Sequence, residues 1–407
     1  MSHGSPWWRQ ATRSQWHTLV AAMAGWMLDA MDVMLYAFAL PSIRGEFGLS
    51  GAQAGALASV TLLASAAGGI AFGVLADRIG RARALQISIL AYSVFTALTA
   101  TAHSLPELVL WRTLVGLGLG GEWAAGSVLV AESWPAAHRG KAIGLMQSGW
   151  ALGYVLAALL TSAVLPHHGW RLLFALGLLP ALLVLWIRRT VPEPAGFRAT
   201  RPGALPWREL LRPPLLNRAV VATVLTTIVL FAYWGLFTWV PAYLASPVEA
   251  GGAGLSIVRS TAFIIPMQLG AWAGYVLFGL MADRWGRRPT FTAFVLAAAA
   301  VVPVYGQLAR HPAILLALGP LLGFAGHGYF SLFGAMLAEL FPGRIRGTAQ
   351  GLCYNLGRAV SALAPLTIGA LADRFGIGSA LALTAAFFAA SALVVRLLPE
   401  TRGEELT

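Results

Sequence analysis

A few ionisable side chains lie inside segments that are otherwise apolar enough for the interior of a membrane. Asp29 and Asp32 lie in the first of these segments, Glu122 in the fourth, His327 in the tenth and Arg358 in the eleventh. Placing an arginine at the centre of a bilayer costs about 2.5–3.5 kcal/mol on insertion scales, so such a group faces protein, water or a ligand. The planar guanidinium matches a carboxylate with two parallel hydrogen bonds. We therefore expect Arg358 to bind an organic anion, and the alternative is a permanent ion pair with Glu122 or an aspartate.

The acidic side chains are candidates for carrying protons. Asp29 and Asp32 lie one helical turn apart and share a helix face. Two neighbouring carboxylates disfavour double ionisation, so one of them holds a proton more readily. Glu122 is either a further protonation site or a fixed counter-ion for Arg358 or His327. The alternative for the aspartates is pairing with a basic group or capping of a neighbouring helix.

Other polar side chains at mid-depth are candidates for contact with the anion. Asn355 precedes Arg358 by three residues and shares its face. His327 is either a proton relay and carboxylate ligand or a residue with one structural hydrogen bond. The remaining candidates are Tyr354, Gln147, Tyr154 and Tyr233. No second metal ligand stands at a suitable spacing from His327, and no cofactor motif or catalytic combination appears, so we expect no metal, no cofactor and no enzyme.

The composition is that of a polytopic membrane protein. The chain has 407 residues, of which 58% are hydrophobic and 11% charged, with a mean hydropathy of +0.71. A soluble protein carries about 25% charged residues. Hydropathy windows of about 19 residues predict an all-α membrane protein with twelve transmembrane helices. These lie near 17–41, 52–76, 84–103, 107–131, 141–165, 170–189, 218–245, 257–281, 290–309, 312–338, 347–371 and 376–398.

The positive charge sets the orientation of these segments. With an even number of spans both termini share one side, and most of the 28 Lys and Arg residues fall on that side. The opposite side receives Arg44, Arg112, Arg171, Arg259, Arg310 and Arg374. The positive-inside rule then places both termini in the cytoplasm, in a multi-pass protein of the inner (plasma) membrane. The net charge of +12 therefore does not indicate nucleic acid.

Internal repeats divide the chain into two halves. Gly73–Arg81 recurs as Gly279–Arg287, and Glu132–Gly140 recurs as Glu339–Gly347. We expect an N-terminal six-helix bundle over residues 1–189, a polar cytoplasmic linker over 190–217 and a C-terminal six-helix bundle over 218–407. The substrate site of such a duplicated carrier lies between the halves near the midplane.

Charged residues of the repeated loops are expected to latch the two halves together at their cytoplasmic ends and to release during transport. The alternative is that these basic turns only set the topology. The gating candidates are Asp77, Arg78, Arg81, Asp283, Arg284, Arg287, Glu132, Arg139, Glu339 and Arg346.

The repeated loop Gly-x-Leu/Met-Ala-Asp-Arg-x-Gly-Arg resembles the signature loop of the major facilitator superfamily. Gly120–Trp123, Val130–Pro135 and Gly351–Arg358 resemble the metabolite:proton symporters of the sialate and monocarboxylate (lactate) type. Asp29-Ala-Met-Asp32 is similar to the Asp-Gly-x-Asp pattern of aromatic-acid:proton symporters, with Ala30 in place of the glycine. The resemblance implies import of carboxylates with protons. The chain is shorter than typical sialate members, which favours a smaller acid.

Taken together, these features predict a proton-coupled symporter that imports a small organic anion by alternating access. The anion is a monocarboxylate such as lactate, a sialate or an aromatic acid, and the protein works as a monomer in the lipid bilayer. An exporter that exchanges a drug or metabolite for protons is an alternative, although the usual exporter signature is absent from Gly149–Gly153. A sugar porter lacks support because Leu225–Ile228 carries no Gln-Gln pair. A membrane sensor that binds ligand without transport is the remaining alternative.

Overall fold

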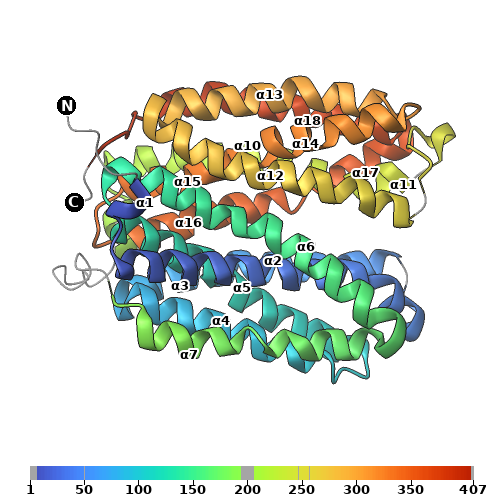
Figure 1. The fold of residues 1–407 in the computed structure, drawn as a ribbon, viewed down its shortest axis with the longest axis horizontal. Coiled ribbons are helices and arrows are strands. Elements are labelled where there is room, and N and C mark those ends of the chain that lie inside the picture. The colour runs from blue at the N-terminus through green and yellow to red at the C-terminus, as the bar shows by residue number, and fades with distance from the viewer. Residues whose placement is uncertain (1–6, 50, 194–205, 246, 256, 405–407) are drawn as a thin grey trace.

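The structure, a computed structural model, describes residues 7–49, 51–193, 206–245, 247–255 and 257–404, which form helices and no strand. Long helices run roughly along one axis (Figure 1). This arrangement follows from the hydrocarbon environment, where a helix satisfies its backbone N–H and C=O groups internally. Within the described residues, 11 helices are long and apolar enough to cross a membrane.

The first half of the chain supplies the helices drawn in blue and green in Figure 1. They are α1 (Trp7–Gln10), α2 (Arg13–Phe47), α3 (Gly51–Ile79), α4 (Arg81–Thr99), α5 (Leu105–Ser133), α6 (Ala136–Ala175), η1 (Leu176–Leu178) and α7 (Ala181–Thr190). Gly169 has a φ of 71°, and there α6 passes from the fifth expected span to the sixth. Of the expected linker, residues 194–205 lie outside the described part of the chain.

The second half supplies the helices drawn in yellow to red. They are α9 (Pro206–Leu210), α10 (Leu215–Phe237), α11 (Val240–Ala245), η2 (Val248–Ala250), α12 (Ile257–Trp285), α13 (Arg287–Gln307), α14 (Pro312–Gly328), α15 (Phe330–Leu340), α16 (Arg346–Ser361), α17 (Ala364–Phe375), α18 (Ile377–Val394) and η3 (Val395–Leu397). The short α9 is held by Arg344, whose Nε donates to Glu209 Oε2 at 2.8 Å. This hydrogen bond lowers the pKa of the Glu209 carboxyl.

Three expected spans of the second half are each divided into two helices. The seventh consists of α10 and α11, the tenth of α14 and α15, and the eleventh of α16 and α17. The division of the eleventh span places a proline in the first turn of α17, where its missing N–H costs no hydrogen bond. Arg358 and His327 therefore lie in the last turns of α16 and α14 rather than in the middle of continuous helices.

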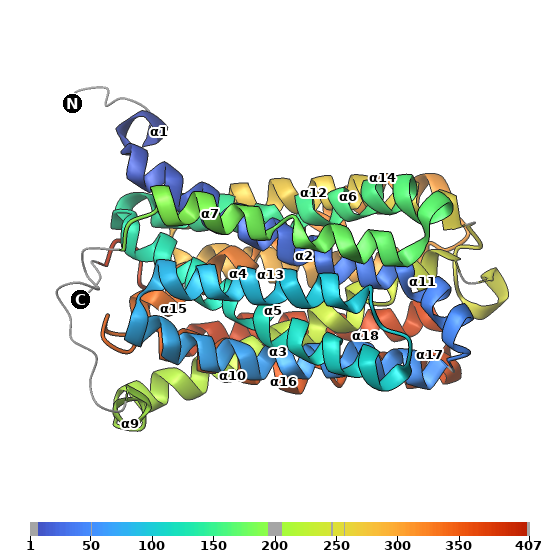
Figure 2. The same cartoon turned by 90° about the horizontal axis from the view of Figure 1, so that it is seen from below.

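The two halves meet along two pairs of helices, α3 with α16 and α6 with α12 (Figures 1 and 2). Glycines make these approaches close. A Cβ on Gly73 would lie 2.5 Å from the carbonyl oxygen of Gly347, and a Cβ on Gly279 would lie 2.3 Å from that of Gly140. Small residues let transmembrane helices approach in this way. The duplication thus repeats the same backbone contact in the two helix pairs.

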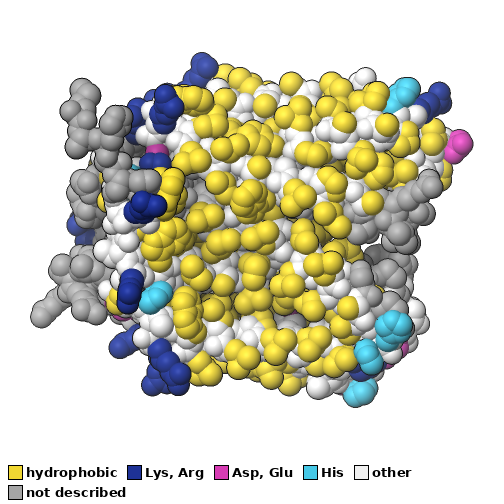
Figure 3. All heavy atoms as spheres, in the orientation of Figure 1, with side chains coloured by type: hydrophobic (Ala, Val, Ile, Leu, Met, Phe, Trp, Pro, Cys, Tyr) yellow, Lys and Arg dark blue, Asp and Glu magenta, His cyan; other side chains and the backbone are white. Residues whose placement is uncertain are grey.

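An apolar belt crosses the middle of the face shown in Figure 3, and Lys and Arg side chains gather at the end that carries both termini. We call this end the basic end. The belt is what a bilayer requires of the surrounding surface, because charged side chains are costly against hydrocarbon. Both features agree with an integral membrane protein.

At the basic end, two glutamates cap the helices that follow the repeated loops. Glu193 accepts hydrogen bonds from the backbone N–H groups of Arg81 (2.7 Å) and Arg83 (3.1 Å) at the start of α4. Glu400 accepts those of Arg287 (2.8 Å) and Arg288 (3.0 Å) at the start of α13. The negative charge of each cap also complements the helix dipole.

The glycine of each repeated loop makes room for its cap. Gly80 and Gly286 have φ values of 109° and 110°, which L-residues rarely adopt. A Cβ on Gly80 would lie 2.4 Å from Glu193 Oε1, and one on Gly286 would lie 2.9 Å from Glu400 Oε2. Both the backbone conformation and the contact with the cap therefore require glycine.

Replacing Gly286 by alanine is expected to destabilise the protein, because it strains the backbone and displaces the Glu400 cap. The strain alone costs about 1–3 kcal/mol. The midpoint of thermal unfolding in detergent measures the effect. The matched control is Gly45→Ala, since a Cβ there meets nothing within 4 Å. Equal midpoints for the two variants would contradict the requirement for glycine at position 286.

Candidate functional site

Arg358 lies between the two halves and is only 7% exposed. Its Nη1 donates a hydrogen bond to Ser65 Oγ of α3, in the opposite half, at 3.1 Å. The guanidinium carbon lies 5.1 Å from the centre of the Tyr354 ring. Among the described residues its Nε has no hydrogen-bond partner and no carboxylate forms an ion pair with it. The guanidinium thus keeps donors available for an anion.

Asn355 of α16 faces α3, as Arg358 does. Its Nδ2 donates to the Gly351 carbonyl at 2.9 Å, and its side chain packs against Gly69 of α3. Ser65 and Gly69 are one turn apart on α3, so both side chains of α16 point to one stretch of the opposite half. Within the described part of the chain, Asn355 Oδ1 has no hydrogen-bond donor.

Two buried acids lie near the guanidinium. Glu122 of α5 is fully buried, and neither of its carboxylate oxygens has a partner among the described residues. Its Oε1 lies against Gly25, where a Cβ would approach within 2.5 Å. Asp29 of α2 is 3% exposed, and both acids lie within electrostatic reach of Arg358. An isolated buried carboxylate is costly when ionised, so Glu122 needs either a proton or a nearby cation.

Asp32, by contrast, has partners of its own. It accepts a hydrogen bond from Thr96 Oγ1 at 2.5 Å and pairs with Arg112 Nη1 at 3.5 Å. Arg112, which the charge count placed on the side opposite the termini, lies inside α5 with 2% exposure and within the span expected near 107–131. Its guanidinium also lies 4.6 Å from the centre of the Tyr36 ring. Burial of Arg112 requires a counter-ion, and Asp32 provides it.

A chain of contacts joins the halves beside Arg358. Tyr354 stacks on Trp123 of α5 with ring centres 3.8 Å apart. Trp123 Nε1 donates to Gln147 Oε1 at 3.1 Å, and Gln147 Nε2 donates to the Phe330 carbonyl at 3.3 Å. These residues come from α16, α5, α6 and α15. The structure therefore brings the predicted Tyr354 and Gln147 together at mid-depth.

The chain continues into an aromatic group of the second half. The ring of Tyr233 lies 4.8 Å from that of Phe330 and 5.1 Å from the imidazole of His327. His327 Nδ1 lies 3.1 Å from the Gly323 carbonyl, and Nε2 has no partner among the described residues. The predicted residues Tyr233 and His327 thus belong to one aromatic group of the second half, which we call the aromatic wall. A series of contacts connects this wall to Arg358, through Phe330, Gln147, Trp123 and Tyr354.

Tyr154 lies at the margin of this group. It is half-buried on α6, and its ring packs edge-on against Phe38 at 6.1 Å. The Tyr233 side chain of the second half lies within electrostatic reach of Tyr154 and close to Trp150, one turn earlier on α6. Tyr154 is therefore near the aromatic wall without a contact to Arg358 among those that the structure records.

The charged residues of the repeated loops join the halves at the basic end. Asp77 of α3 accepts hydrogen bonds from the backbone N–H groups of Gly347 (3.1 Å) and Thr348 (2.6 Å) at the start of α16. Arg346 Nη1 donates to Glu132 Oε1 at 2.7 Å, and Arg81 Nε donates to Glu132 Oε2 at 3.0 Å. Carboxylates near a helix N-terminus are stabilised by the helix dipole.

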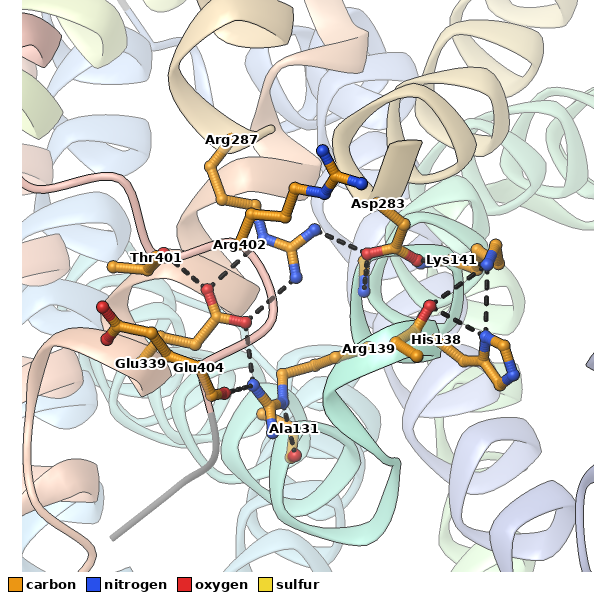
Figure 4. A network of polar contacts seen from close by, with 12 residues as sticks. Ala131, His138, Arg139, Lys141, Asp283, Arg287, Glu339, Thr401, Arg402 and Glu404 are labelled. Atoms are coloured by element: carbon orange, nitrogen blue, oxygen red, sulfur yellow. Dashed lines mark hydrogen bonds and ion pairs between the residues drawn. The ribbon is translucent and has the colours of Figure 1, made fainter. Parts of the chain in front are cut away.

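The second copy of this arrangement appears in Figure 4. Asp283 accepts the backbone N–H groups of Gly140 and Lys141 at 3.0 and 2.9 Å. The buried Glu339 accepts hydrogen bonds from Arg139 of the first half at 2.8 Å and from Arg287 of its own half at 3.0 Å. Each half therefore contributes an acid and an arginine to the other.

Two gating candidates lie outside these networks. Arg78 and Arg284 are exposed, and no hydrogen bond or ion pair of theirs is recorded among the described residues. Further residues contribute without having been predicted as site residues, namely Ser65, Arg112, Glu193 and Glu400. The repeat of Pro-Glu in both halves was a signal for the two glutamates, whereas nothing local marked Ser65.

Neutralising Glu339 is expected to loosen the contact between the halves at the basic end. Glu339→Gln leaves Arg139 and Arg287 without a shared counter-ion, and breaking a buried ion pair costs about 3–5 kcal/mol. Amide hydrogen exchange should become faster at the start of α6 and at the end of α12. Glu249→Gln, an exposed change at the opposite end, is the control. Unchanged exchange in Glu339→Gln would show that the network does not hold the halves together.

Comparison with known proteins identifies relatives of this fold. The Major Facilitator Superfamily model matches residues 22–275 and 258–407. A protein of Cupriavidus pinatubonensis described as a probable 4-methylmuconolactone transporter is 37% identical over 98% of this chain and 93% of its own length. The cis,cis-muconate transport protein of Acinetobacter baylyi is 34% identical over 86% of each chain.

A solved structure shows the same architecture. The proton:xylose symporter XylE, bound to 6-bromo-6-deoxy-D-glucose, superposes with a TM-score of 0.81 over 97% of this chain and 98% of its own, at 20% identity. The resemblance inferred from the repeated loops is thereby confirmed, as is the prediction of two six-helix bundles. The chain belongs to the major facilitator superfamily of membrane transporters.

Proposed function

We propose that the protein is a proton-coupled symporter that carries a small organic anion across the bilayer by alternating access. The observation behind this proposal is the buried guanidinium of Arg358, which has no carboxylate partner among the described residues. Such a cation between the two halves is stable only with a compensating group. An anion bound there supplies that charge in the loaded carrier.

The relatives support a small carboxylate as the substrate. Two of them are described as transporters of 4-methylmuconolactone and cis,cis-muconate, which are both small organic acids. A guanidinium binds a carboxylate with two parallel hydrogen bonds. Aromatic rings lie beside Arg358, with Tyr354 stacked on Trp123, and aromatic surroundings suit the carbon skeleton of an unsaturated or aromatic acid.

Asp29 and Glu122 are the best candidates for the proton site. Both are buried near Arg358, and Glu122 has no hydrogen-bond partner in the described part of the chain. Asp32 is less suited, because Arg112 and Thr96 already stabilise its ionised form. One proton taken up by Asp29 and Glu122 offsets the charge of a monoanion on Arg358, so loading leaves the net charge at the centre of the carrier unchanged.

The paired networks at the basic end supply the gate. They join the halves in this structure, so the loaded carrier has to break both before the site opens at that end. By the positive-inside rule we assign the basic end to the cytoplasm. Release of the anion there completes import.

Replacing Arg358 by lysine is expected to reduce uptake of the anion in proteoliposomes by roughly ten- to a hundredfold. Lysine keeps the charge but loses the bidentate geometry, and a hydrogen bond to a charged group contributes about 1.5–3 kcal/mol. The assay uses a pH gradient and a panel of radiolabelled muconate, lactate, aromatic acids and sialate. The matched control is Arg374→Lys, an exposed arginine at the end of α17. Normal uptake by Arg358→Lys would show that Arg358 has a structural role and does not bind the anion.

Removing both candidate proton acceptors separates coupling from binding. In Asp29→Asn/Glu122→Gln, both side chains mimic the protonated form, so exchange of labelled for unlabelled anion should persist while a pH gradient no longer drives accumulation. Counterflow and gradient-driven uptake are measured on the same vesicles. Accumulation that still follows the gradient would exclude these acids. Anion efflux driven by inward proton flow in the unmodified protein would instead indicate an exporter.

A further inference from the structure

A concave surface lies on the outside of the second half at the basic end. Its volume is about 680 Å³, and it is bounded by the end of α12, the start of α13 and η3. The residues that line it are Trp285, Arg288, Pro289, Thr292, Ala293, Arg396 and Glu400. Its lining residues include neither Arg358 nor a residue that pairs across the halves, so transport does not explain it.

One cationic group of this concavity is held in place and the other is exposed. Arg288 Nη2 donates to the carbonyl oxygen of Arg396 at 2.8 Å, which ties α13 to η3 and directs one guanidinium across the concavity. Arg396 is exposed, and no hydrogen bond of its guanidinium is recorded among the described residues. The carboxylate of Glu400 accepts the backbone N–H groups of Arg287, Arg288 and Arg402. Its charge is therefore directed at the start of α13, and the two guanidinium groups remain for an anion.

The surface around the concavity is that of a membrane boundary. Trp285 is 57% exposed at its rim, and tryptophan is enriched at the level of lipid headgroups. Leu296 of α13 and Leu397 of η3 are exposed on the elements that form it, and Leu393 is exposed at the end of α18, just before η3. An amphiphile bound here would place its acyl chains on these leucines and its headgroup between the arginines.

The first half of the chain lacks this combination of a tryptophan, two arginines and a capping glutamate. Trp285 corresponds to Ile79 and Arg288 to the buried Ala82, whereas Glu400 corresponds to the equivalent cap Glu193. The capping glutamate is needed by the fold in both halves. The tryptophan and the first arginine are found in one half only, so the helix turn itself does not require them.

We propose that this concavity binds the headgroup of an acidic phospholipid from the leaflet at the basic end. Basic sites at the membrane boundary attract anionic lipids, and guanidinium groups match phosphate oxygens with paired hydrogen bonds. The site is independent of the transported anion, because it opens to the lipid and not to the space between the halves.

The test is native mass spectrometry of the purified full-length protein, titrated with phosphatidylglycerol or phosphatidylcholine in detergent. Phosphatidylglycerol should be retained in preference to phosphatidylcholine. Arg288→Gln/Arg396→Gln should weaken retention by about 30-fold, the effect of removing two arginines near a charged headgroup. Arg288→Lys/Arg396→Lys should restore much of it, which guards against a loss caused by misfolding.

The matched control removes the same charge from the equivalent place in the first half. Arg83→Gln/Arg189→Gln, two exposed arginines at the same end, should leave retention of phosphatidylglycerol unchanged. Equal retention by the unmodified protein and by Arg288→Gln/Arg396→Gln would overturn the proposal. Equal retention of phosphatidylcholine and phosphatidylglycerol would overturn it as well. The proposal would also fail if inorganic phosphate displaced bound phosphatidylglycerol as effectively as added phosphatidylglycerol does, because the ligand of the site would then be a soluble anion.

Discussion

An ionised side chain in hydrocarbon has no water to stabilise it, and this constraint accounts for the position of the buried charges described here. Asp32 lies against Arg112, and Glu339 lies between Arg139 and Arg287. These pairs are complete within the protein. A buried charge without a counter-ion in the protein needs one from a bound ligand or proton. The need for such an external counter-ion distinguishes a binding site from a structural ion pair.

The duplication makes that distinction visible. At the basic end, the acids and arginines of one half recur in the other and form equivalent contacts, such as Asp77 on Gly347 and Asp283 on Gly140. At mid-depth the equivalence ends, because Arg358 corresponds to Ala151. The residues that close the basic end are thus present twice, whereas those that we assign to substrate and proton are present once.

Much of the architecture was predictable because hydropathy and repeats are properties of local sequence. The helical spans, the basic end and the acid–arginine clusters followed from them. The role of Arg112 did not, because the window that places it within the span near 107–131 does not reveal its partner Asp32, 80 residues earlier. Nor did the bonds of Gln147 to Trp123 and Phe330, which depend on how the two halves are set against each other. The caps Glu193 and Glu400 lie more than 100 residues from the helices they complete, a separation that periodicity cannot reveal.

The end of α16 soon after Arg358 bears on how tightly the proposed anion would be held. The last carbonyl groups of a helix carry partial negative charge, and Arg358 lies in the final turn of its helix. Part of its positive charge is therefore offset by its own backbone before any ligand arrives. A transporter has to release its substrate as well as bind it. A guanidinium whose positive charge is partly offset favours a short residence time of the bound anion over high affinity.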